Sequence, residues 1–455
     1  MDLEKRYQEA LEWIHSLGRF GSKPGLERIT ALLEMLDNPH HRVCFIHIGG
    51  TNGKGSTAAI LASILRSAGY RVGLYTSPYL LSFTNRMAVN GSDIAQRDLV
   101  QLVERIRPLV EKISSDRDFG EMTEFEVVTA LALYYFAAQK VDLVVFEVGL
   151  GGRLDATNVV NPLLSIITNI SLEHTAVLGS TIEAIAAEKA GIIKKEKPLL
   201  TAAEDQRALS VFQARCSELK APLYRVYPPQ VETDQDRKKK PVAVFSKTTD
   251  EGQMFSYRGF SLDLKDLFIP LRGKYQLNNA ATALAALELL VKENFSADEG
   301  AVRKGLAEIN WPGRLELLQR DPLVIMDGAH NPAAIEKLAE AVPQYFSYRR
   351  LVLVIGILAD KDIAAMLEHI LPLADAVIFT RPVLPRAADP FDVAAFAVSH
   401  FKLQKEHLVI DAYDEALDRA LELAGPEDAV LVTGSLYTVS DIRAYWQVRY
   451  NQVGR

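Results

Sequence analysis

The stretch HIGGTNGKGST, residues 47–57, is rich in glycine and contains one lysine, as phosphate-binding loops do. The common form of such a loop is G-x-x-x-x-G-K-[ST]. Here Gly49 stands only four residues before Gly53, and Gly55 follows Lys54 where that pattern has a hydroxyl. The flanking sequence therefore has to decide whether this loop binds phosphate.

The residues on either side of the loop have the patterns of a strand and a helix. Residues 42–48, RVCFIHI, form an apolar run that is typical of a buried strand. Residues 56–70 carry apolar residues at helical spacing and include the stop signal Gly69. The loop then lies at a helix N-terminus, where unpaired N–H groups and the helix dipole favour phosphate. We expect Lys54 to reach the outer phosphates and Ser56 to offer a hydroxyl to magnesium; a glycine-rich turn without a ligand is the alternative.

Length and composition fit an enzyme of two or three domains. The chain has 455 residues, of which 48% are hydrophobic and 24% charged, so it can bury a sizeable core. Its net charge of −7 leaves no electrostatic footprint for nucleic acid. Cys44, in the apolar strand, and Cys216, in an expected helix, are too few for a disulfide framework and lack metal-ligand spacing.

The N-terminal residues do not have the pattern of a targeting signal. Residues 1–17, MDLEKRYQEALEWIHSL, carry acidic residues and an amphipathic helical pattern, unlike a secretory signal. No apolar run approaches the length of a membrane span. We expect a soluble, cytoplasmic monomer that acts without nucleic acid or membrane.

Strand and helix patterns alternate from the glycine loop to about residue 220, which predicts a mostly parallel sheet with helices on its faces. The further strands are expected at 71–76, 142–149, 163–170 and 198–203. After a charged loop at 231–241, residues 242–264 alternate like an antiparallel hairpin, and an alanine-rich helix follows at 278–293.

A second, smaller α/β unit is expected in the last third of the chain. Pro312 and Gly313 form a natural break. Strand and helix patterns then alternate again, with strands expected in 322–327, 350–358, 375–380 and 428–435. We predict one domain over 1–310, built on a P-loop-type, mostly parallel sheet with a small antiparallel β segment, and a smaller Rossmann-like α/β domain over 311–455.

Two polar side chains stand where predicted strands end. Glu147 closes an apolar run, and Ser77 follows the strand at 71–76. The carboxyl ends of parallel strands open toward a ligand crevice. Mg²⁺ prefers hard oxygen ligands and keeps several waters, so one carboxylate, one hydroxyl and the phosphates of a nucleotide are enough to hold it. A strand-end cap or an arginine partner is the alternative role of Glu147.

Eight motifs, taken in order, resemble those of the folylpolyglutamate synthases and dihydrofolate synthases, members of the Mur ligase superfamily. They cover most of the chain: GTNGKGS at 50–56, TSPYL at 76–80, TEFE at 123–126, EVGLGGRLDATN at 147–158, SLEHTAVLG at 171–179, EKAGI at 188–192, WPGRLE at 311–316 and DGAHNP at 327–332. In that family the shortened loop with glycine after the lysine is the usual form and binds ATP. The resemblance implies an ATP-binding domain over 1–310 and a ligase domain over 311–455.

The resemblance also implies ATP and two magnesium ions in the cleft between the domains. The first magnesium would bind Ser77 and Glu147, and the second would bind His174 and Lys189, the lysine as a carbamate. The implied ATP contacts are Gly50, Thr51, Asn52, Gly53, Lys54, Gly55, Ser56, Asn279, Arg314 and Asp327.

Several of these residues have simpler interpretations from sequence alone. His174 is then an ordinary loop histidine hydrogen-bonded to backbone. Lys189 is a helix lysine paired with Glu188 or a neighbour. Asn278 is an adjacent alternative to Asn279, and helix N-capping would explain either asparagine.

The remaining implied roles concern the acceptor and the amine. His330 would lie near the γ-phosphate and the glutamate, and it joins Lys54 and Lys189 as a residue of the chemical step. Phe125 would stack on a pterin and Asp155 would pair with its amino-pyrimidine edge, although Phe125 is equally well read as a core residue. The implied acceptor contacts are Thr123, Phe125, Arg153, Asp155 and Ala156.

The implied reaction joins L-glutamate to a reduced folate, and also to dihydropteroate, with ATP as the energy source. Transfer of the γ-phosphoryl group to the acceptor carboxylate makes an acyl phosphate, which the amine attacks, so no nucleophilic side chain is needed. A small-molecule kinase and an ATP-gated binding module are the alternatives from other classes. A cell-wall Mur ligase shares the fold and the chemistry, but the pterin-type motifs argue against it.

Overall fold

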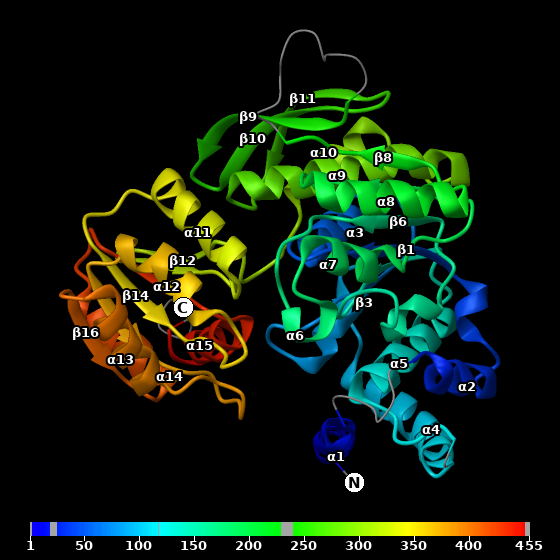
Figure 1. Ribbon diagram of the computed structural model, residues 1–455, viewed down its shortest axis with the longest axis horizontal. Helices are drawn as coiled ribbons and strands as arrows, with labels where there is room; N and C mark the ends of the chain where they lie inside the picture. Colours follow the sequence, from blue (N-terminus) through cyan, green and yellow to red (C-terminus); the bar gives the residue numbers. More distant parts are fainter. Residues whose placement is uncertain (1, 19–24, 117, 229–239, 451–455) are drawn as a thin grey trace.

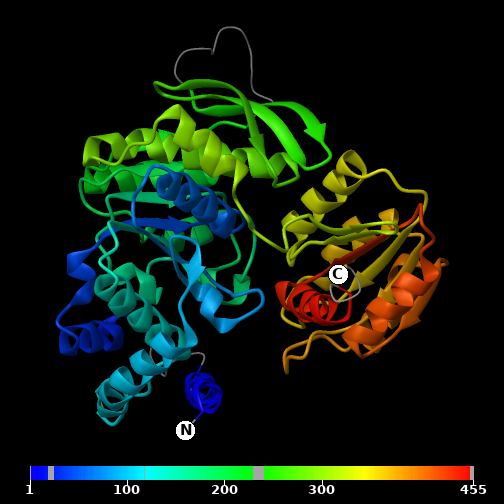
Figure 2. The ribbon, with the colours of Figure 1, turned by 180° about the vertical axis from the view of Figure 1, so that it is seen from behind.

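The computed structural model describes residues 2–18, 25–116, 118–228 and 240–450. The charged loop expected at 231–241 lies almost entirely outside these ranges. The described residues form two α/β units that lie side by side, one coloured blue to green and the other yellow to red (Figures 1 and 2). None of the described helices is long and apolar enough to cross a membrane.

Within the described residues, eight strands form the sheet of the first unit in the order β4-β3-β2-β5-β1-β6-β7-β8. They are β1 (Cys44–Gly49), β2 (Val72–Tyr75), β3 (Met87–Val89), β4 (Ser92–Asp93), β5 (Leu143–Glu147), β6 (Leu164–Ile167), β7 (Leu199–Thr201) and β8 (Leu223–Arg225). Six neighbouring strands are parallel, namely β2, β5, β1, β6, β7 and β8. The strands β3 and β4 form an antiparallel edge. The prediction of a mostly parallel sheet is confirmed, and the antiparallel edge adds to it.

Helices cover both faces of this sheet because successive strand residues point to opposite sides. Ile46 and Ile48 pack in one core with α3, α9 and α10, and Phe45 packs in another with α2, α4 and α5. The helices of this unit include α1 (Leu3–Ser16), α2 (Glu27–Met35), α3 (Lys54–Ser67), α4 (Gln96–Ser114), α5 (Glu124–Ala138), α6 (Thr175–Leu178), α7 (Ile182–Ala190), α8 (Gln206–Leu219), α9 (Lys274–Leu290) and α10 (Glu299–Ala307).

A small antiparallel sheet packs on α9, at the top of Figure 1. In the described part of the chain it has three strands, β9 (Val242–Thr249), β10 (Gly252–Arg258) and β11 (Asp263–Ile269). The sequence predicted a hairpin over 242–264, which β9 and β10 form, but it did not predict the third strand, β11, most of which lies beyond residue 264. Its alternation is broken by the adjacent polar residues Lys265 and Asp266, and Asp266 has a left-handed φ of 52°.

In the described residues of the second unit, six strands form a sheet in the order β12-β13-β17-β14-β15-β16, parallel except for β12. They are β12 (Glu316–Arg320), β13 (Leu323–Met326), β14 (Leu351–Ile355), β15 (Ala376–Phe379), β16 (Glu406–Val409) and β17 (Ala429–Thr433). The helices α11 (Pro332–Tyr345), α12 (Ile363–Ile370) and α13 (Pro390–Phe401) share a core with one face, and α14 (Tyr413–Leu423) and α15 (Leu436–Arg449) with the other. The predicted smaller Rossmann-like unit is confirmed.

The strand order of the first sheet brings four loops together. β5 lies between β1 and β2, with Glu147 beside Ile48 and Phe146 beside Tyr75. β6 pairs with the other side of β1. Because these four strands are parallel, the loops that follow them share one edge of the sheet, where parallel α/β sheets bind ligands.

Candidate active site

The glycine loop after β1 is shaped by close contacts at two of its glycines. Gly53 has a φ of 82°, and a Cβ atom there would lie 2.4 Å from Oδ1 of Asn279. A Cβ atom at Gly55 would lie 3.0 Å from Cζ2 of Trp311 and 3.4 Å from Oε2 of Glu147. The glycine that replaces the usual hydroxyl residue after Lys54 therefore lets the start of α3 approach a carboxylate and the Trp311 ring closely.

Two lysines converge on the backbone of this loop. Nζ of Lys54 donates to the carbonyl oxygens of Gly50 (3.2 Å) and Thr51 (3.0 Å), and Nζ of Lys189 donates to that of Gly50 (2.8 Å). Burial and the nearby charge of Lys54 lower the pKa of Lys189 to about 7. The alternative in which Lys189 pairs with Glu188 is wrong, because Glu188 binds Arg153 at 2.9 Å.

Glu147 and Ser77 meet at the ends of β5 and β2, as the sequence predicted. The backbone N–H of Ser77 donates to Oε2 of Glu147 over 3.1 Å. Burial raises the pKa of Glu147 to about 7, against the opposing effect of Lys54. One carboxylate and one hydroxyl beside a phosphate-binding loop fit Mg²⁺, which takes hard oxygen ligands and leaves room for water and phosphate. In the described part of the chain, no three His, Cys, Asp or Glu side chains form a metal cluster by themselves.

His174 lies at the start of α6 with a left-handed φ of 51° and makes no side-chain cap. Burial and the charge of Lys361 lower the pKa of its imidazole to about 4. Its ring is therefore neutral near pH 7, the form that binds a metal.

One cavity of about 530 Å³ contains most of the predicted nucleotide and metal residues. It lies between the two units and is lined by Thr51, Asn52, Gly53, Lys54, Gly55, Ser56, Ser77, Glu147, His174, Lys189, Asn279, Arg314, Asp327 and His330, together with other residues. Gly50 does not line the cavity, but its carbonyl oxygen accepts hydrogen bonds from Lys54 and Lys189, which do. We call this the nucleotide cavity.

The two candidate asparagines of α9 both line the nucleotide cavity. The N-cap of α9 is Gly273, so helix capping explains neither of them. Nδ2 of Asn279 donates to Oε1 of Gln276 over 2.8 Å, and the Asn279 amide faces Gly53. Asn279 is thus the residue in contact with the loop.

Asp327 joins two segments of the second unit by hydrogen bonds. Its carboxylate accepts hydrogen bonds from the backbone N–H groups of Leu315 and Ala329, both at 2.8 Å. Burial raises the pKa of Asp327, and the positive charge of Arg314 opposes that rise. The side chain ties the segment that carries Arg314 to the loop that carries His330.

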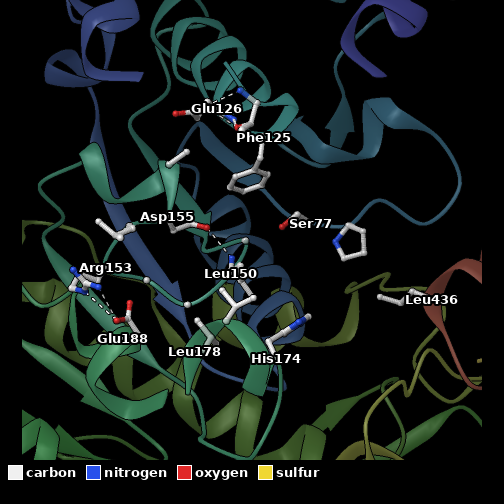
Figure 3. Close-up of a pocket in the computed structure, with 18 of the residues that line it drawn as sticks. Ser77, Phe125, Glu126, Leu150, Arg153, Asp155, His174, Leu178, Glu188 and Leu436 are labelled. Atoms are coloured by element: carbon white, nitrogen blue, oxygen red, sulfur yellow. Dashed lines mark hydrogen bonds and ion pairs between the residues drawn. The ribbon is translucent and has the colours of Figure 1, made fainter. Parts of the chain in front are cut away.

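A second cavity, of about 680 Å³, joins the first. All five predicted acceptor residues line it: Thr123, Phe125, Arg153, Asp155 and Ala156. Ser77, His174, His330 and Leu436 line both cavities. Figure 3 shows the Phe125 ring between Asp155 and Ser77, with Leu436 approaching from the second unit. We call this the acceptor cavity.

Asp155 is held by its own loop. Its carboxylate accepts from the N–H of Leu150 (2.8 Å) and from both the N–H (3.0 Å) and the hydroxyl of Thr157. Nε2 of the buried His47 lies 2.8 Å from that hydroxyl. A chain of hydrogen bonds thus runs from the sheet to the wall of the acceptor cavity.

The sequence reasoning missed several charged residues of the site. Four basic residues also line the acceptor cavity: Arg28, Arg86, Lys361 and Arg386. They come from separate elements of both units, so no spacing in the sequence joins them. Glu173, which lines the nucleotide cavity, stands in the SLEHT motif, but only its neighbour His174 had been assigned a role.

Comparison with known proteins assigns the chain to a family. The Mur ligase middle domain matches residues 48–287, and the Mur ligase glutamate ligase domain matches residues 313–436. The dihydrofolate synthase/folylpolyglutamate synthase of Bacillus subtilis is 40% identical over 443 residues, covering 96% of this chain and 98% of the relative. This chain belongs to the Mur ligase family of folylpolyglutamate and dihydrofolate synthases. It is therefore an ATP-dependent ligase, as predicted.

Solved structures of this ligase family agree with that assignment. Mycobacterium tuberculosis folylpolyglutamate synthase, complexed with ADP and AMPPCP, has a TM-score of 0.89 at 31% identity and covers 97% of this chain and 98% of its own. Escherichia coli FolC in complex with DHPP and ADP has a TM-score of 0.83 at 32% identity, with the same coverage. The kinase and binding-module alternatives are not supported.

Proposed function

We propose that this ligase adds L-glutamate to a reduced folate and, at the same site, to dihydropteroate. The observation that carries the proposal is the junction of the two cavities at Ser77, His174 and His330. One cavity contains a phosphate-binding loop, and the other presents the ring of Phe125 to a flat ligand. An acceptor carboxylate at the junction can meet the γ-phosphate of ATP.

ATP is proposed to bind in the nucleotide cavity, with its phosphates on residues 50–56. Asn279 would face the adenine side, and Arg314 and Asp327 would contact phosphate and ribose. Because these residues come from both sides of the proposed boundary at 310/311, closure of the two domains would complete the site.

Two magnesium ions are part of the proposal. Ser77 and Glu147 would hold one, and His174 with carbamylated Lys189 would hold the other. Bound there, the ions would neutralise charge on the phosphates. A carbamate forms from a neutral amine, and the lowered pKa of Lys189 supplies that form near pH 7.

The proposed chemistry needs positioning and charge more than a reactive side chain. A carboxylate oxygen of the acceptor attacks the γ-phosphorus, and ADP leaves. The amine of glutamate then attacks the acyl carbon, and phosphate leaves with the oxygen that came from the carboxylate. Lys54 would stabilise the phosphoryl oxygens, and His330 would face the phosphate and the amine.

The bifunctional part of the proposal rests on the size of the acceptor cavity and on the relatives. Folate is longer than dihydropteroate by one glutamate, and a cavity of about 680 Å³ leaves room for a shift of the pterin. The Bacillus subtilis relative is named for both activities, and the Escherichia coli structure contains DHPP.

The test is ATP- and glutamate-dependent product formation with each acceptor in separate reactions. We expect turnover of both acceptors and a loss with Asp155→Ala. Asp155→Asn is the matched control for loop structure, since its amide oxygen can still accept from Leu150 or Thr157. No turnover of dihydropteroate would remove the second activity, and turnover of neither acceptor would remove the substrate class.

A further inference from the structure

A buried carboxylate joins the two units beside the junction of the cavities. Glu173 follows β6 in the first unit and immediately precedes His174. Its side chain is only 9% exposed. A carboxylate taken out of water needs positive or hydrogen-bonding partners. When those partners come from another part of the chain, the contacts fix the position of that part relative to the carboxylate.

Three donors of the second unit converge on Oε1 of Glu173. Nδ2 of Asn331 lies 3.1 Å away, Nζ of Lys361 3.2 Å and Nε2 of His330 3.3 Å. The Lys361 side chain is only 8% exposed, so the ion pair is shielded from water on both sides.

The contact with Glu173 also determines how His330 can act. Nδ1 of His330 lies 2.9 Å from the carbonyl oxygen of Gly328, while Nε2 faces Glu173. The contacts with Glu173 and with the Gly328 carbonyl oxygen thus orient the ring at the junction of the cavities.

Asn331 extends the network to the phosphate loop. Its Nδ2 donates to Oδ1 of Asn52 (2.9 Å), and Nδ2 of Asn52 donates back to Oδ1 of Asn331 (3.3 Å). The same Oδ1 accepts from the N–H of Ala334 and so caps α11. Glu173 is therefore bonded to a residue that reaches both the nucleotide loop and the start of a helix in the second unit.

We propose that Glu173 is a positioning residue that holds His330 and Lys361 at the junction of the cavities, so that the amine-binding side of the site lies over the activated acceptor. The inference rests on the proposed function for its catalytic consequence. The geometric part of the inference, that one carboxylate joins the two units, is independent of the proposed function. The two parts can therefore be measured separately.

Glu173→Gln keeps the shape of the side chain and removes its charge. We expect kcat for ligation to fall by about 100-fold, the loss that follows from a small misplacement of reacting groups. KM for glutamate should rise as well, because the positioned residues face the amine. ADP affinity should stay within about threefold, since the Lys54 loop remains intact. Glu173→Asp retains the charge and should recover part of the lost activity.

The matched control is Tyr345→Phe, which removes another hydrogen bond between the units. The hydroxyl of Tyr345 donates to Oε1 of Gln253 over 2.6 Å, and neither residue lines either cavity. This variant should keep the kinetics of the wild type. Small-angle scattering should show a larger radius of gyration for ligand-free Glu173→Gln than for the wild type, and thermal melting checks that each variant is folded.

The outcomes separate this inference from the proposed function. Wild-type kinetics and an unchanged radius in Glu173→Gln would overturn the positioning role. An ADP affinity that falls in proportion to kcat would also overturn it, because Glu173 would then belong to nucleotide binding. If the wild type ligates neither acceptor, the proposed function fails, while scattering and ADP affinity still measure whether Glu173 joins the units.

Discussion

The backbone N–H of Ser77 donates a hydrogen bond to Oε2 of Glu147 over 3.1 Å. This contact joins the ends of β2 and β5 and places a hydroxyl residue beside a buried carboxylate. Gly55, at the start of α3, approaches the same carboxylate. The arrangement ties the metal-binding function proposed for Glu147 to the phosphate-binding function proposed for the loop.

Glu147→Gln should reduce turnover mainly through weaker magnesium binding, because an amide oxygen is a poorer ligand for a hard cation than a carboxylate. Turnover as a function of magnesium concentration should shift to higher concentrations, and manganese should restore part of it. Glu196→Gln, at an exposed position, is the control. Unchanged metal affinity, with no recovery at high magnesium or manganese, would refute the metal role.

Lys54→Ala should lower kcat by at least ~100-fold, because one preorganised positive charge at the phosphates is lost. The fold should remain intact, since the glycines shape the loop backbone and Lys189 still donates to the carbonyl oxygen of Gly50. Turnover measures the loss in kcat and thermal melting measures whether the fold is intact, with Lys195→Ala, at an exposed position, as control. Near-normal turnover in Lys54→Ala would rule out a catalytic phosphate site here.

Lys189→Ala should be nearly inactive, and short carboxylic acids should partly restore its activity by supplying the missing oxygen ligands. In the wild type, the neutral amine fraction rises as pH increases through the lowered pKa of about 7. Carbamate formation should therefore increase from pH 6 to pH 8. Carbon-13 NMR with labelled carbon dioxide would detect it, and full activity of Lys189→Ala would contradict the role.

His47 should make the protein sensitive to acid. Burial lowers the pKa of its imidazole to about 3, and its Nδ1 has no partner among the described residues. Both folded and unfolded chains carry neutral His47 above pH 6.5, so stability is lost only as pH falls from 6.5 toward 3. At pH 5 the loss is about 2 kcal/mol, from 1.36 kcal/mol per pH unit.

The measurement for His47 compares unfolding midpoints in urea at pH 7.5 and pH 5. His47→Gln should lose less stability between these two values than the wild type, because glutamine does not titrate and can still bond to Thr157. The test compares the loss of stability in the two proteins, because the other histidines contribute equally to that loss in both. An identical loss in the two proteins would show that His47 does not carry this effect.

The parts of the site that could be predicted are those fixed by local pattern and strand order. A strand, a glycine loop and a helix identified the phosphate-binding loop. Glu147 and Ser77 end parallel strands, and such ends share one edge of a sheet. Their direct contact follows from β5 pairing with β2.

Contacts between distant residues could not be predicted from these patterns. Arg153, rather than Lys189, takes Glu188 as its partner, which depends on how the 149–155 loop packs on α7. Glu173 binds Asn331 and Lys361, which lie 158 and 188 residues further along the chain. In the sequence, an acidic residue before a histidine does not predict such partners. The third strand of the small sheet could not be predicted, because Lys265 and Asp266 interrupt its alternation.

The central claim, that ATP activates the acceptor carboxylate as an acyl phosphate, is tested most directly by oxygen transfer. The acceptor carboxylate is labelled with oxygen-18, and the protein is supplied with ATP, magnesium and L-glutamate. We predict that each inorganic phosphate released with a ligated product carries one labelled oxygen, because the bond between carbon and that oxygen breaks when the amine attacks. Ligated product accompanied by unlabelled phosphate would contradict the account.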